Sequence, residues 1–156
     1  MNLEEQKYMA LEGIHTWAHA TVRHAAELSK FQRSFAAGNF IGVRRDFESE
    51  RHIFLIVAHR LMSYINWATD LNFIDTQIFN EVKRFELDIK TMRDLNEHVI
   101  EYFRGGGRRP QLWSTENADA SSTMGTRIGD RLDWLEVKDA VETLIKKSPP
   151  YYHPAA

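Results

Sequence analysis

The sequence lacks cysteine, long apolar runs and a leader-like start. Because none of the 156 residues is cysteine, disulfides, thiolate metal sites and thiol nucleophiles are excluded, and an intracellular compartment is favoured. The longest aliphatic run is IFLIVA, residues 53–58, which is far too short to span a bilayer. The first residues, MNLEEQK, are acidic where a signal peptide is basic and apolar. We therefore expect a cytoplasmic protein that has no membrane partner.

A strong excess of charge of either sign is also missing. The formal net charge is -2, from 20 Lys and Arg against 22 Asp and Glu. Any contact with nucleic acid must then come from a local basic patch and not from the field of the whole protein. Hydrophobic residues make up 43% of the chain and charged residues 27%, which is typical of one globular domain with a real core. We expect a single domain over residues 1–150 and a tail over residues 151–156.

Apolar residues recur at helical spacing along most of the chain. Asp75 is placed to cap one helix, which Gly105 ends, and Asp133 with Glu136 forms a D-x-x-E cap for the last helix. Antiparallel packing is the economical arrangement for such helices. The expected helices cover about residues 3–36, a second segment that closes near residue 70, residues 75–105, and residue 133 to the prolines at 149 and 150.

One polar stretch interrupts the helices. Between Arg108 and Arg131, the pieces LWST and TMGTRIG can pair as a small hairpin across NADASS. Any strand is expected to lie within residues 108–131. The predicted fold is therefore all-α, an antiparallel bundle of four to five helices with a small β-hairpin insertion near residues 108–131.

The most informative stretch is RDLNEHVIEYFRGGGRR, residues 93–109. Asp94, His98 and Tyr102 follow one another at steps of four, so a carboxylate, an imidazole and a phenol are adjacent on one helix face. Arg93 and His98 are five residues apart, roughly 140° around an ideal helix, so they do not share a face. Only a bent arginine side chain or a second protomer brings both to one substrate.

Asn96 interrupts the apolar stripe of the same helix. It stands where Met92 and Val99 predict an apolar residue. We expect its amide to face the core or an interface, where it needs a polar partner.

The order R-x4-H in RDLNEH, with a polar residue after the arginine, resembles the signature of the HEPN superfamily. The segment RDLNEHVIEY, which precedes a glycine turn, is similar to HEPN-like helices of bacterial members of this superfamily. The resemblance implies a helical bundle, usually a homodimer, in which arginine and histidine of two protomers flank a cleft and cut RNA without metal or cofactor. It implies Arg93, Asp94 and His98 as catalytic residues.

The chemistry of these residue types suits that reaction. His98 can take a proton from a 2'-hydroxyl near neutral pH, Arg93 can hold the phosphate oxygens, and Asp94 can fix the imidazole tautomer. Cleavage of single-stranded RNA would then leave 2',3'-cyclic phosphate ends. Stacking, hydrogen bonding and local positive charge for binding the RNA are expected from Asn96, Tyr102, Arg104, Arg108 and Arg109.

Three other interpretations stay open. Charged residues in the last turns of a helix that ends in glycine are also explained by helix capping alone. The chain can be a non-enzymatic helical dimer, such as an inactive HEPN domain, a toxin–antitoxin component or an adaptor, with a regulatory protein as partner. Glu12, His15 and His19 match half of a carboxylate and histidine metal site in a helical bundle.

Overall fold

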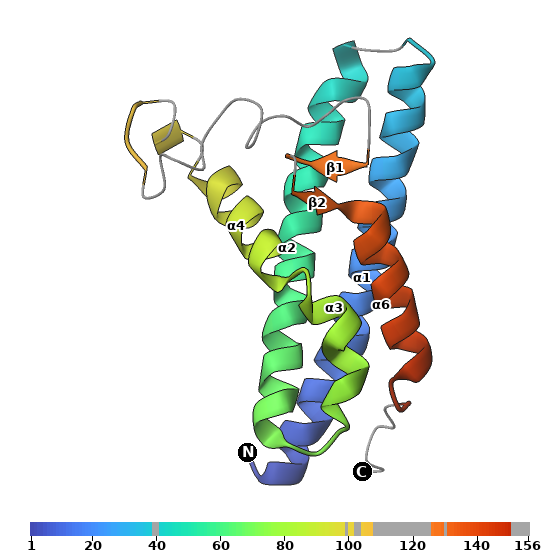
Figure 1. Ribbon diagram of the computed structural model, residues 1–156, viewed down its shortest axis with the longest axis vertical. Helices are drawn as coiled ribbons and strands as arrows, with labels where there is room; N and C mark the ends of the chain where they lie inside the picture. The colour runs from blue at the N-terminus through green and yellow to red at the C-terminus, as the bar shows by residue number, and fades with distance from the viewer. Residues whose placement is uncertain (39–40, 99, 102–103, 108–125, 130, 151–156) are drawn as a thin grey trace.

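The protein is a bundle of α-helices built on one long hairpin. The computed structural model describes residues 1–38, 41–98, 100–101, 104–107, 126–129 and 131–150. Helices α1 (Leu3–Ala36) and α2 (Ile41–Leu71) run antiparallel, and α6 (Trp134–Lys147) packs along α1 (Figure 1). After α2, the chain forms a 3₁₀ turn, η1 (Thr76–Phe79), and then the helices α3 (Asn80–Lys83) and α4 (Glu86–Glu97). Five α-helices thus occupy the described residues, which confirms the all-α prediction.

The core lies between α1, α2 and α6. Its fully buried side chains come from every helix at the predicted spacing, and the largest of them is Trp134 at the start of α6. The Trp134 ring packs edge-on against Phe47 of α2, and its indole N–H donates to Ser29 Oγ of α1 at 3.1 Å. One residue therefore ties the last helix to both helices of the hairpin.

The third predicted helix is divided, and the prediction of one continuous helix over residues 75–105 was wrong. Asp75 does accept from the Gln77 amide at 3.0 Å, but it caps the 3₁₀ turn η1. The chain bends at Arg84 and Phe85, where the Phe85 amide bonds Val82 three residues back. The bend lets α3 contact α6 while α4 crosses α2 obliquely (Figure 1).

Helix α4 also ends earlier than predicted. His98 is its C-terminal cap, with φ −107° and ψ 19°, and residues 100–101 are helical again. The expected glycine ending is nevertheless present further on. Gly105 has a φ of 79°, and the Gly106 amide bonds the Glu101 carbonyl at 2.9 Å.

The structure contains a hairpin, but not the predicted pairing of LWST with TMGTRIG: part of TMGTRIG forms the first strand, and its partner follows it in the chain. β1 (Arg127–Ile128) pairs with β2 (Leu132–Asp133), so β2 lies just beyond the predicted range of residues 108–131. The turn between the strands contains Gly129, whose φ is 54°. The LWST segment lies outside the described residues, as does the tail of residues 151–156.

Candidate functional site

Arg93 lies on α4 and is held by carboxylates of its own helix. Its Nε donates to Glu97 Oε1 at 3.1 Å, and its Nη2 lies 2.9 Å from Glu97 Oε2. Asp94 Oδ1 is 3.6 Å from Nη1. The planar fork of the guanidinium is therefore engaged by two oxygens of one carboxylate, which is the bidentate geometry that arginine also offers to phosphate.

His98 has a separate partner. Its Nδ1 lies 3.1 Å from Glu101 Oε1, and its side chain is 44% exposed. The Asp94 side chain contacts Arg93, whereas the link from Asp94 to His98 is the backbone bond from the His98 amide at 3.1 Å. Glu101, and not Asp94, is thus the carboxylate at hydrogen-bond distance from this imidazole.

Asn96 turns toward the core and has the polar partner that the sequence predicts. Its Oδ1 accepts from Nη2 of Arg51 at 3.3 Å, and its Nδ2 donates to the Met92 carbonyl at 2.7 Å. Arg51 is a buried cation of α2. The amide of Asn96 is thus used to join α4 to α2.

A groove between α2 and α4 brings Arg93 next to a histidine that the sequence did not point to. The groove has a volume of about 230 Å³. Two effects lower the pKa of His59 below its ordinary value of 6.5. Burial is the larger, and the positive charge of Arg93 is the second. We call this hollow the α2–α4 groove, and its lining residues are Ile56, His59, Arg60, Ser63, Arg93 and Glu97.

Sequence reasoning missed His59 because nothing in the order of residues pairs position 59 with position 93. His59 lies on the solvent-facing side of α2 by its spacing, where histidines are common. Its neighbourhood is set by the crossing of α4 over α2, which is a tertiary feature. The one signal in the sequence is that His59 and Arg60 directly follow Ala58, a small apolar residue on a helix that another element must cover on one side. Ala58 is buried in the structure.

The other predicted binding residues flank the three glycines in the sequence. Arg104 is exposed just before Gly105. Tyr102, Arg108 and Arg109 lie outside the described residues.

The metal alternative gains no support from geometry. Among the described residues, no three His, Asp or Glu side chains lie close enough together to hold an ion. Glu12, His15 and His19 all fall within that part of the chain, and His15 Nε2 instead donates to the Pro149 carbonyl at 2.9 Å.

Among the described residues, no helix is both long enough and apolar enough to cross a membrane.

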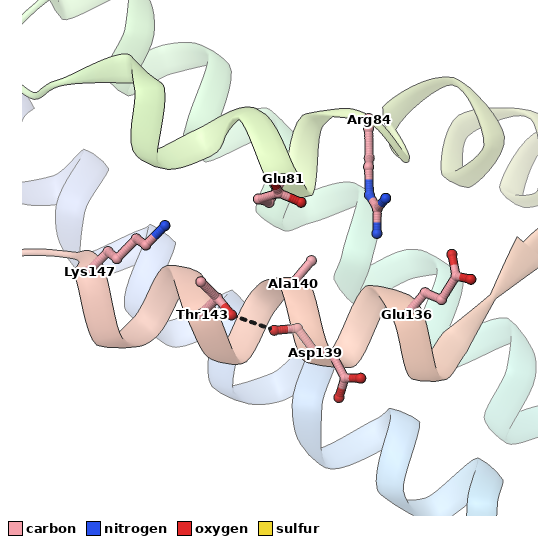
Figure 2. A pocket seen from close by; sticks show the side chains of 7 residues that line it. All are labelled: Glu81, Arg84, Glu136, Asp139, Ala140, Thr143 and Lys147. Carbon is pink, nitrogen blue, oxygen red and sulfur yellow. Dashed lines mark hydrogen bonds between the residues drawn. The ribbon is translucent and has the colours of Figure 1, made fainter.

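A second hollow lies between α3 and α6. Figure 2 shows Glu81 of α3 and Arg84, the residue after α3, facing Glu136 and Lys147 of α6 across an open groove of about 510 Å³. Acidic and basic side chains of the two helices alternate along it. We assign no chemistry to this groove, because the side chains that line it carry charges of both signs.

The class that these observations define is an all-α bundle with a polar groove at the crossing of α2 and α4. Comparison of the chain with protein-family models, with curated proteins and with solved structures found no match. Inferences about function therefore depend on the chain's own residues.

Proposed function

We propose that this protein is a metal-independent endoribonuclease, resembling HEPN domains, that cleaves single-stranded RNA. The observation that supports this best is the position of the R-x4-H residues. Arg93 lies in the last two turns of α4 and His98 is the C-terminal cap of that helix, and their side chains are 29% and 44% exposed. Both are therefore accessible to a polymer that cannot enter a closed pocket.

The reaction needs a base and a cation. In the proposed reaction the His98 imidazole takes the proton of a 2'-hydroxyl, and the resulting oxygen attacks the adjacent phosphorus. The bond from phosphorus to the 5'-oxygen breaks, the leaving 5'-oxygen takes a proton from water, and the other product carries a 2',3'-cyclic phosphate. Arg93 stabilises the added negative charge on the phosphate oxygens. Arg104, exposed nearby, adds positive charge for the RNA backbone.

A homodimer completes the proposed site. Within one chain, Arg93 and His98 bond to different glutamates, and no contact joins their side chains in the described structure. Large apolar side chains are exposed close to this end of the molecule, namely Ile53 and Ile56 on α2 and Ile100 beyond α4. A second copy packed there covers apolar surface and can supply the missing histidine or arginine.

Purified protein should cleave single-stranded RNA in the presence of a chelator and leave 2',3'-cyclic ends. His98→Ala should lower the rate by roughly two to four powers of ten, as expected for loss of a positioned acid or base. His19→Ala is the matched control, because His19 is an exposed histidine on α1. Equal activity of the wild type and His98→Ala would indicate a contaminating nuclease and would contradict the proposal.

A non-enzymatic dimer is the second candidate, favoured by the contacts of Arg93. Its guanidinium fork is already occupied by Glu97, so an incoming phosphate must displace a carboxylate. A chain that sediments as a dimer and binds RNA or a protein without cutting RNA would support this candidate over the nuclease. A monomer at micromolar concentration would contradict both.

A further inference from the structure

We propose that the α2–α4 groove binds a phosphate group through Arg93, Arg60 and His59. Glu97 competes with that phosphate for Arg93. The subsite itself does not depend on RNA cleavage, so it goes beyond the proposed function. Only the identity of the phosphate as part of an RNA backbone rests on that function.

The first support is the way Glu97 lies on Arg93. The two carboxylate oxygens sit 3.1 Å from Nε and 2.9 Å from Nη2. Two oxygens of a phosphate can occupy the same two donors, since both anions match the spacing of the guanidinium fork. Glu97 thus stands where a ligand oxygen pair would stand, and it shows that the fork is directed at an anion beside the groove.

The second support is the charge on the opposite wall. Arg60 lines the groove from α2, and no carboxylate among the described residues lies within ion-pair distance of it. Arg93 is paired with Glu97 and Asp94 of its own helix, whereas Arg60 faces the groove without an acidic partner among the described residues. An anion bound in the groove would give Arg60 the acidic partner that it lacks there.

The third support is His59, which lines the groove together with both arginines. Its charged surroundings are Arg93, Lys90, Asp94 and Glu97 from α4, and Arg60 from its own helix. Because burial and Arg93 lower the pKa of His59, the imidazole is neutral near pH 7 and can donate one N–H without a proton being taken up. Ser63 completes the polar lining, although its hydroxyl donates to the His59 carbonyl at 3.2 Å.

The test is a titration of the full chain with inorganic phosphate at pH 7, followed by NMR of the histidine ring protons. The His59 signal is identified as the one absent from His59→Gln. It should move with phosphate concentration, while the His52 signal, seven residues earlier on α2, should stay in place. A stationary His59 signal would overturn the proposal.

A pair of glutamate variants separates the local effect from net charge. Glu97→Gln should bind phosphate about two- to fivefold more tightly, the range expected when a partly exposed ion-pair competitor is removed. Glu101→Gln removes the same charge from the neighbouring turn without touching Arg93, so it should bind as the wild type does. Equal tightening in both variants would show a general charge effect and would overturn the proposal.

Loss of the arginine gives the opposite direction. Arg93→Met should weaken phosphate binding about tenfold or more, because a charged hydrogen-bond donor is lost. Circular dichroism establishes that the variant is folded. If Arg93→Met does not fold, Arg60→Met is used, since Arg60 is exposed and its removal leaves the α2–α4 packing intact.

Two further ligands identify the source of the phosphate. One is a 5'-mononucleotide, and the other is a single-stranded RNA oligomer with hydroxyl groups at both ends. Displacement of inorganic phosphate by the oligomer assigns the subsite to the RNA backbone, and displacement by the mononucleotide alone assigns it to a terminal phosphate. Phosphate binding without RNA cleavage would retain the subsite and reject the nuclease, whereas cleavage with no effect of phosphate on His59 would do the reverse.

Discussion

Gly13 of α1 lies directly against the aromatic ring of Tyr64 of α2. A β-carbon at residue 13 would come to 2.0 Å from Tyr64 Cδ1 and 2.1 Å from Cε1. The ring therefore fills the space that any other side chain at this position would need. In the middle of a long helix, where glycine is otherwise unfavourable, this close approach explains its presence.

Replacement of Gly13 by alanine should destabilise the protein. Alanine favours the helix by roughly 1 kcal/mol, but the displaced Tyr64 ring costs more, since overpacking typically costs about 1–3 kcal/mol. Urea unfolding followed by circular dichroism measures the net change. In a Tyr64→Ala background the clash is gone, so Gly13→Ala should there become stabilising. A variant that is more stable than the wild type with Tyr64 present would contradict the close contact.

Asp133 links the hairpin to α6. Its Oδ1 accepts from the amides of Leu135 and Glu136 at 2.9 and 3.3 Å, and its Oδ2 accepts from the Thr126 hydroxyl at 2.8 Å. Asp133→Ala should therefore lower the free energy of unfolding by about 1–2 kcal/mol, the usual range for loss of an N-cap. Asp133→Asn is the matched control and should cost much less, because asparagine caps helices as well as aspartate. An equal loss of unfolding free energy in Asp133→Ala and Asp133→Asn would assign the effect to the charge of Asp133 and not to the N-cap.

His59 should make the folded state sensitive to acid. Its pKa is lowered in the folded protein by burial and then by Arg93, so the unfolded chain binds a proton more readily. Stability is then complete above the ordinary pKa near 6.5 and falls as the pH drops below it toward the lowered value. Thermal unfolding between pH 7.5 and 5 should show this slope, and His59→Gln should flatten it. His52→Gln should keep the slope, and a slope that survives in His59→Gln would assign it to another group.

The bounds of a helix could be predicted from the sequence where one apolar stripe packs against one neighbouring element. α1, the end of α2 and the Asp133 cap of α6 all follow from local spacing and capping chemistry. The bend at Arg84 and Phe85 does not. Residues on both sides of it keep helical periodicity, and only the positions of α6 and α2 decide that α3 must turn away from α4.

The candidate site shows the same division. The need of Asn96 for a partner follows from its place in an apolar stripe, but the partner, Arg51, is 45 residues away and could not be named. The contact of Arg93 with Glu97 follows from a spacing of four. The approach of His59 to Arg93 does not, because it depends on the angle at which α4 crosses α2.

The bend between α3 and α4 also determines how the candidate site is attached to the molecule. α4 has only 12 residues, and its buried side chains are Ile89, Thr91, Met92 and Leu95. A helix of this length is marginal on its own, so its backbone amides are protected from solvent exchange only while these four side chains remain docked. Detachment of α4 is accordingly a smaller event than separation of α1 from α2. Arg93 and His98 travel with it, so the candidate site is carried by a segment whose opening involves a few side chains and not the whole core.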